Sequence, residues 1–279
     1  MSASQFIFSC VPTTMATITR ITATARSATT SFREKLSTSF AISLLAAAVI
    51  GNNAAGDPIP EGPPGDIGTL TEEDFIVDGS AGGAKRFTFT NGERSLYFIP
   101  MIHIAEQPFY DRIAAEVERL KLNGADLYYE FIDFDTASVA DKRRIRAMLG
   151  MLPSPAFYAE NVSDGLVAQD NEAFLGFPGG QDVNVDLTPA QIADAYEMLI
   201  GPLEISEENL STPMRDFVLP TADPARVTQI TVDARNRHLA AVIDTAPGNV
   251  VVLYGAAHGA GTLQELRALD PEWRRAPTF

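Results

Sequence analysis

The chain has 279 residues, a single cysteine and a formal net charge of −15 at pH 7, with 21 basic against 36 acidic residues. Nucleic acids and anionic lipid surfaces are bound by basic surfaces, so this charge argues against both as partners. The hydrophobic content of 46% is ordinary for a globular core.

The first 55 residues differ from the rest of the chain. They carry four basic residues and one acidic residue, so their net charge is +3 and the remainder carries −18. The basic stretch leads into an apolar segment, residues 40–50, which is followed by small residues. This order is typical of a secretory signal peptide, and the apolar segment is shorter than the roughly 20 residues that span a bilayer. We therefore expect a secreted or periplasmic protein that begins between Gly51 and Asp57, has no stable membrane anchor and has lost Cys10.

Two alternatives for this region stay open. Met15 could be the true start, or the first forty residues, which are rich in Ser, Thr and Arg, could be an organellar transit sequence. Residues 56–80 begin with many prolines and glycines and predict an extended leader. Residues 81–279 have the length of one domain.

The first elements of this domain are two strands, a helix and a third strand. Residues 86–90 alternate between polar and apolar side chains and precede Asn91-Gly92, a strong hairpin signal, so residues 95–101 are expected to be the partner strand. Apolar residues at helical spacing predict a helix over 109–120, and a strand follows at 127–131. Strand, helix and strand at this spacing indicate a βαβ unit with a parallel strand pair.

The second half predicts mostly helices with two further strands. A capping box at Thr188 and Pro189 marks the start of one helix, and Asp223-Pro224 marks the start of another. The expected elements are helices over 142–151, 156–171, 189–200 and 224–245, strands over 183–187 and 250–254, and a short closing helix. The pattern predicts an α/β fold: a mixed central sheet with βαβ units and flanking helices, and a site at the carboxyl ends of the strands.

Three side chains with metal-binding chemistry lie at strand ends. His103 follows the strand 95–101, His258 follows the strand 250–254, and Glu130 lies near the end of 127–131. If these strands are neighbours, the three side chains meet at one edge of the sheet. Two imidazoles and a carboxylate can hold zinc or a similar ion with an open position for water, which is equipment for hydrolysis.

Other interpretations of these residues remain open. A single histidine after a strand is often a hydrogen-bonded structural residue, and Glu130 could form a buried ion pair with Arg235 or Arg237. The third histidine, His238, shares a helix face with apolar residues and is expected to pack there. The sequence contains no His-Glu-x-x-His, no Gly-x-Ser-x-Gly and no phosphate-binding loop.

Short motifs at these positions resemble those of the TraB/PrgY/GumN/Tiki superfamily. The matching positions are Gly255–His258 for the second Gly-x-x-His motif, Pro100–His103 for the first, Glu130 in Tyr-Tyr-Glu-Phe, Arg235 and Arg237 in an Arg-rich helix, and Asp186. The resemblance spans about residues 86–269. Pro100 departs from the family, which has glycine there.

The resemblance implies an α/β fold, an extracytoplasmic or membrane setting and, for the Tiki branch, a metal-dependent peptidase. It implies that His103, Glu130 and His258 bind a divalent ion such as Zn, Mn or Co, with Glu130 as third ligand or general base. Arg235 would orient a substrate carboxylate or the oxyanion, and Asp186 and Arg237 would support the ligands. We therefore expect a secreted hydrolase that cleaves peptides. The alternative is a non-catalytic protein that binds a metal, haem or a peptide in the same cleft.

Overall fold

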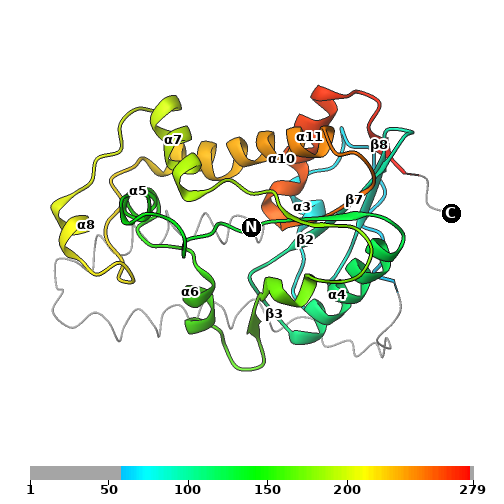
Figure 1. The fold of residues 1–279 in the computed structure, drawn as a ribbon, viewed down its shortest axis with the longest axis horizontal. Coiled ribbons are helices and arrows are strands. Elements are labelled where there is room, and N and C mark those ends of the chain that lie inside the picture. The colour runs from blue at the N-terminus through cyan, green and yellow to red at the C-terminus, as the bar shows by residue number, and fades with distance from the viewer. Residues whose placement is uncertain (1–57, 277–279) are drawn as a thin grey trace.

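A computed structural model describes residues 58–276, and their centre is a six-stranded mixed sheet (Figure 1). The strand order is β6-β4-β7-β2-β1-β8, in which β6, β4, β7 and β2 are parallel and β1 and β8 are antiparallel to their neighbours. The α/β fold expected from the sequence is confirmed. The expected signal peptide lies outside the described residues.

The strands of this sheet are short, and a separate two-stranded sheet lies beside it. The bounds in the main sheet are β1 Phe87–Thr90, β2 Ser95–Met101, β4 Asp126–Tyr129, β6 Asp182–Asn184, β7 Val250–Gly255 and β8 Arg274–Arg275. The small sheet pairs β3, Ile104–Ala105, with β5, Val167–Ala168.

Helices surround the sheet and form a lobe at one side. The α-helices are α3 Glu72–Phe75, α4 Gln107–Leu122, α5 Val139–Leu149, α6 Pro155–Glu160, α7 Pro189–Leu199, α8 Glu207–Ser211, α9 Pro224–Thr228, α10 Arg235–Asp244 and α11 Gly259–Leu269. Two 3₁₀ segments, η2 Asn171–Phe174 and η4 Ala256–His258, and one π-helical segment, η3 Gln229–Ala234, complete them.

The local signals in the sequence placed several elements correctly. The hairpin of β1 and β2 forms with Thr90 opposite Ser95, and Gly92 has a φ of 96°, a conformation that favours glycine. Thr188 and Gln191 form the expected capping box of α7.

The βαβ unit differs from the expectation in one respect. The strands β2 and β4 are parallel and joined by α4, but they are not hydrogen-bonded to each other. Strand β7, the last long strand in the chain, lies between them and pairs with both. Its buried run of Val250, Val251 and Val252 suits a strand covered on both faces. The three strands that carry the candidate site are therefore neighbours.

Two apolar layers cover the two faces of the sheet. On one face, Phe98 and Val252 pack with residues of α3, α10 and α11. On the other face, Ile99 and Leu253 pack with residues of α4. Figure 1 shows α10 and α11 on the opposite side of the sheet from α4. Alternation along the buried strands sends neighbouring side chains to opposite layers, because the side-chain period of a strand is two.

Three segments differ from the sequence expectations. Ile59, Leu70 and Phe75 are buried, so the segment 58–80 is packed into the core instead of forming an extended leader. The helix expected over 156–171 is only the short α6, and the chain then turns into β5 and η2. The helix expected over 224–245 contains the π-helical segment η3 between α9 and α10.

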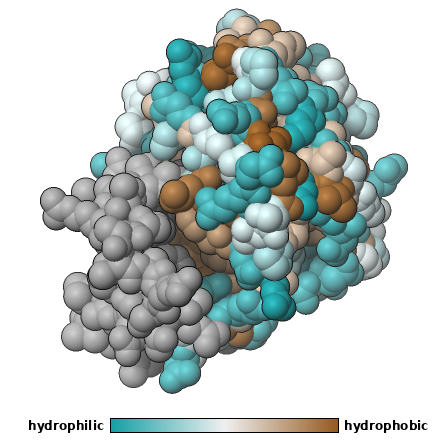
Figure 2. Space-filling model, turned by 90° about the vertical axis from the view of Figure 1, so that its left-hand side faces the viewer, coloured by the Kyte–Doolittle hydropathy of each residue, from teal (hydrophilic) through white to brown (hydrophobic). Residues whose placement is uncertain are grey.

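A helical lobe extends from the sheet and has its own apolar cluster. Side chains of α5, α7 and α9, among them Ile145, Met148 and Ile192, pack together there. Figure 2 shows this side of the molecule as mainly hydrophilic, with separate apolar groups between the polar ones. No helix within residues 58–276 is long and apolar enough to cross a membrane.

Candidate functional site

The candidate residues meet at the carboxyl ends of β2, β4 and β7. Glu130 directly follows β4, His103 follows β2 by two residues, and His258 ends η4 just after β7. All three line one pocket with a volume of about 380 Å³. The structure therefore brings together the three side chains that the sequence placed at neighbouring strand ends.

A buried ion-pair cluster forms the base of this pocket. Arg235, at the start of α10, contacts Glu130 at 2.5 Å and Asp186 at 2.6 Å. The side chain of Asp186 is fully buried and also accepts a hydrogen bond from the hydroxyl of Tyr254 at 2.8 Å. The second oxygen of Glu130 accepts the backbone N–H of Gly255. Two carboxylates and one guanidinium give the cluster a net negative charge.

Arg235 uses all of its hydrogen-bond donors inside the protein. Its Nε and Nη2 donate to the two oxygens of Asp186, and Nη2 also donates to Glu130. Its Nη1 donates to the carbonyl of Thr231 and contacts Nε2 of His258, both at 3.2 Å. A guanidinium has five N–H groups, so none is left for a substrate carboxylate or an oxyanion. The role that the resemblance implies for Arg235 would require one of these bonds to be exchanged.

The partners of His258 determine its tautomer. Arg235 can only donate, so Nε2 of His258 must be the acceptor and Nδ1 must carry the proton. Nδ1 then donates to Oδ1 of Asn236 at 2.7 Å. His258 is 2% exposed. Burial, and then the charge of Arg235, hold the pKa of His258 well below its ordinary value, so the ring is neutral.

Two glycines near His258 allow this packing. A Cβ on Gly255 would lie 3.0 Å from the carboxylate of Glu130, and a Cβ on Gly261 would lie 2.1 Å from the amide nitrogen of Asn236. The missing side chains of these glycines thus give room to the chain's own Glu130 and Asn236.

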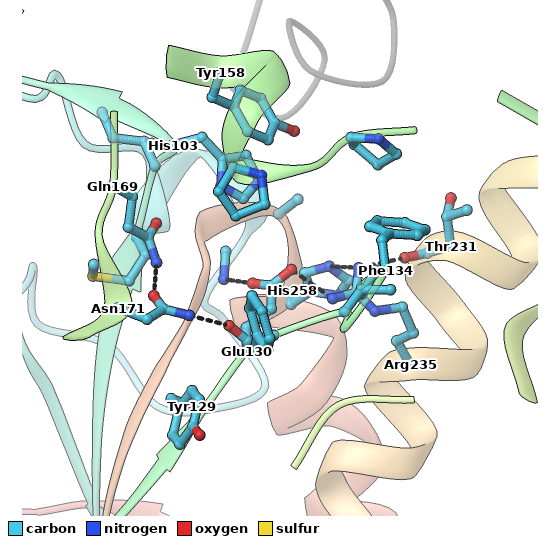
Figure 3. Close-up of a pocket in the computed structure, with 18 of the residues that line it drawn as sticks. His103, Tyr129, Glu130, Phe134, Tyr158, Gln169, Asn171, Thr231, Arg235 and His258 are labelled. Atoms are coloured by element: carbon cyan, nitrogen blue, oxygen red, sulfur yellow. Dashed lines mark hydrogen bonds and ion pairs between the residues drawn. The ribbon is translucent and has the colours of Figure 1, made fainter. Parts of the chain in front are cut away.

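His103 differs from His258 in its contacts. Within residues 58–276 its ring forms no hydrogen bond, and it stacks on the ring of Tyr158 with centroids 4.2 Å apart. Figure 3 shows Tyr158 and His103 on one side of the pocket and Arg235 with His258 on another. Burial holds the pKa of His103 below its ordinary value, although the Glu130 carboxylate opposes this effect. His103 is thus a neutral imidazole beside a carboxylate.

Glu130 and Tyr158 also have displaced pKa values. Burial acts to raise the pKa of Glu130, but the charge and hydrogen bond of Arg235 and the hydrogen bond from Gly255 together hold it below the ordinary value. Glu130 is therefore ionised. Burial raises the pKa of Tyr158 well above its ordinary value, so its hydroxyl keeps its proton. Such displaced pKa values are frequent at functional sites.

The pocket is polar at one end and apolar elsewhere. The polar end contains the cluster, His103 and the segment 169–172, which is held beside His103 by a bond from the N–H of Gln169 to the carbonyl of His103 at 2.8 Å. Asn171 donates to the backbone carbonyl of Glu130 at 3.1 Å. The other walls come from the residues after β4 and from α5 and α7.

The side chains of this arrangement do not fit the expected divalent ion. Both oxygens of Glu130 and Nε2 of His258 already have partners. In the part of the chain that the structure describes, no three His, Cys, Asp or Glu side chains are grouped to hold a metal ion. The guanidinium of Arg235 takes the position of a cation between Glu130 and His258. The ion stays a prediction, and binding it would require Arg235 to release both partners.

Several site residues could not be found from the sequence. Asn236, Tyr158 and Tyr254 belong to the site through contacts between distant segments, and no local pattern marks them. Asp186, expected as a supporting residue, does contact the cluster, whereas Arg237 is exposed and belongs to the other side of α10. His238 is half-buried and does not line the pocket.

The fold and the pocket define an α/β protein with a buried, charged site at the carboxyl ends of three parallel strands, where such folds bind ligands. No protein-family model, no curated protein and no solved structure matches the chain. The resemblance to the TraB/PrgY/GumN/Tiki superfamily therefore stays a prediction.

Proposed function

We propose that this protein is an exported hydrolase that cleaves an amide bond in a peptide or a related small substrate, with His103 as the general base. The observation that carries the proposal is the state of His103: a neutral imidazole whose ring forms no hydrogen bond within residues 58–276, in a largely apolar pocket beside the ionised Glu130. An imidazole in this state can accept a proton at neutral pH. Export rests on residues 1–55, which lie outside the described part of the chain.

The proposed reaction begins with a water molecule between His103 and the substrate carbonyl. His103 takes a proton from the water while its oxygen attacks the carbonyl carbon, and the carbonyl electrons move to the oxygen. The C–N bond then breaks, and the leaving amine takes the proton back from His103. Glu130 favours the imidazolium that exists between these steps, since its charge acts to raise the pKa of His103.

Two groups can stabilise the oxyanion in this reaction. The hydroxyl of Tyr158 lines the pocket, keeps its proton and has no hydrogen-bond partner among residues 58–276. The segment η4 and helix α11 form a continuous helical run whose first residues, Ala256 and Ala257, also line the pocket. The first N–H groups of a helix lack internal partners and favour negative charge.

None of these steps uses a metal ion. The divalent ion that the motif resemblance implies is therefore a separate prediction. If Arg235 were displaced, His103, Glu130 and His258 would supply two nitrogens and a carboxylate, a set that suits zinc and similar ions. Such an ion would polarise the carbonyl and lower the pKa of bound water.

A second function is favoured by one observation. All donors of Arg235, both oxygens of Glu130 and the acceptor of His258 are engaged. A closed network of this kind suits a non-catalytic protein that binds a ligand in the apolar part of the pocket. Measurements of hydrolysis and of ligand binding separate the two functions.

The experiment measures release of p-nitroaniline from N-acetyl-L-phenylalanine p-nitroanilide by the exported protein and by the His103→Gln variant. Loss of a general base typically costs about 10²–10⁴-fold in rate, and we expect a loss in this range. The matched control is His238→Gln, which changes a histidine outside the pocket and is expected to keep the wild-type rate.

Each protein is assayed after treatment with a chelator and again with added Zn²⁺, Mn²⁺ or Co²⁺. Activity that survives chelation and disappears in His103→Gln supports the imidazole mechanism. Activity that appears only with an added ion supports the metal prediction instead. If the His103→Gln variant is active, His103 is not the general base. If the wild type is inactive in every condition, the hydrolase function fails and the ligand-binding function remains.

A further inference from the structure

The apolar part of the pocket bears on the kind of substrate that enters it. Three structural segments contribute its wall: the residues after β4, helix α5 and helix α7. Phe134 and Ile132 come from the first, Ile145 and Met148 from the second, and Ile192 from the third. In Figure 3, Phe134 lies across the pocket from His103. The bond to be cleaved would lie at the polar end, so another group of the substrate would contact this wall.

The size of the pocket limits that group. Its volume of about 380 Å³ is near the lower end of the range of roughly 300–1,000 Å³ that is usual for small-molecule sites. It can enclose one large side chain together with the reacting group, but not a long folded segment. Met148 and Met151 line it as well, and flexible thioether side chains adapt to apolar groups of different shapes.

The charges in the lining disfavour an anionic substrate. Arg235 is the only basic residue that lines the pocket in the described part of the chain, and all its donors are used. Three acidic residues, Glu130, Asp170 and Glu172, also line it. A carboxylate or phosphate entering the pocket would meet negative charge and no free cationic partner, and burial of an unpaired charge is unfavourable.

We infer that the pocket selects substrates with one bulky, uncharged apolar group next to the bond that is cleaved, such as an aromatic residue or leucine, and rejects acidic ones. The inference rests on the proposed hydrolase function and adds a substrate class to it. The wall formed by the residues after β4 and by α5 and α7 sets this preference, and His103 performs the proton transfer.

The experiment compares three N-acetyl amino-acid p-nitroanilides, those of phenylalanine, glycine and glutamate, by their kcat/KM values. A single methylene in an apolar pocket can change kcat/KM by about 10–200-fold, so we expect the phenylalanine compound to exceed the glycine compound by at least about 100-fold. The glutamate compound should be the poorest. Equal values for phenylalanine and glycine, or a preference for glutamate, would overturn the inference.

The variant Ile132→Trp narrows the pocket at a half-buried position, and Leu199→Trp is its control because Leu199 is exposed at the end of α7 and lies outside the lining. Ile132→Trp should lower kcat/KM for the phenylalanine compound at least about tenfold more than for the glycine compound. The control should keep both values. If Ile132→Trp melts far below the wild type, Leu149→Trp, at another half-buried lining position, takes its place.

Binding separates this inference from the proposed function. N-acetyl-L-phenylalaninamide is titrated into the wild type and into both tryptophan variants, and binding is followed by ligand-observed NMR. If no compound is hydrolysed but the amide binds the wild type and the control and not Ile132→Trp, the hydrolase function fails and the apolar selectivity stands. Absence of both hydrolysis and binding overturns both proposals.

Discussion

Arg235 connects four segments of the chain through its side chain. Its partners are Glu130 after β4, Asp186 after β6, Thr231 in η3 and His258 in η4. A buried guanidinium is stable only when its charge and its donors are matched, so each partner matters to the others. The charge balance of the cluster predicts which substitution is most harmful.

Replacing Arg235 should destabilise the protein most. Arg235→Met leaves Glu130 and Asp186 as buried carboxylates without a cation, and breaking a buried pair costs about 3–5 kcal/mol. Asp186→Asn should come second because Asp186 forms two bonds to Arg235 and one to Tyr254. Glu130→Gln should cost least, since Asp186 still neutralises Arg235.

Urea unfolding of the three variants measures these free energies, with Arg237→Met as the exposed control. A cost for Glu130→Gln equal to that of Arg235→Met would contradict the order. The same Glu130→Gln protein also tests the expectation from the sequence that Glu130 takes part in hydrolysis, because its stability is expected to be largely kept.

His258 should make stability depend on pH. Its pKa in the folded protein is well below the ordinary value of 6.5, so between these two values the unfolded chain binds a proton that the folded chain does not. The contribution of neutral His258 to the free energy of unfolding is therefore fully present above pH 6.5. It is lost as the pH drops below 6.5, by up to about 1.4 kcal/mol per pH unit.

Urea unfolding at intervals between pH 7.5 and pH 5.5 checks this slope. His258→Gln should be less stable at pH 7.5 but should show a flatter slope, because the group that takes up the proton is gone. An unchanged slope in His258→Gln would mean that other groups cause the pH dependence.

At the scale of elements, the site depends on how α10 and α11 approach each other behind β7. The π-helical segment η3 precedes α10, and its Thr231 carbonyl accepts a bond from Arg235. Segments of this kind are often found at functional sites, where they shift the register of the helix that follows. Asn236, next along α10, reaches His258 because Gly261 on α11 has no side chain.

The variant Gly261→Ala tests this contact. Its Cβ would overlap the amide of Asn236, so Asn236 must move and its bond to His258 is disturbed. Overpacking of this kind costs about 1–3 kcal/mol, although alanine is otherwise the better helix former by about 1 kcal/mol. Gly248→Ala is the control, because a Cβ there meets nothing within 4 Å. Thermal and urea unfolding should show a clear loss only in Gly261→Ala, and a stabilised Gly261→Ala would contradict the packing argument.

For the whole molecule, the position of β7 decides where the site forms. By inserting between β2 and β4, the last long strand brings His258 beside residues that lie more than 120 positions earlier in the chain. The helical lobe then closes the apolar side of the pocket. The site thus lies between the sheet and the lobe, and both contribute to its lining.

Local patterns were enough to predict the hairpin, the capped helices, the α/β class and the strand-end positions of His103, Glu130 and His258. These features depend on turn residues, caps and side-chain periods, which act over a few neighbouring residues. The ion pair of Glu130 with Arg235 was one of the interpretations that the sequence left open. The insertion of β7, the packing of residues 58–80, the bonds of Arg235 to Thr231 and His258 and the stacking of Tyr158 on His103 could not be predicted in this way. They depend on which distant segments pack against each other and on which charged groups are then buried together away from water. Both are properties of the packed chain as a whole.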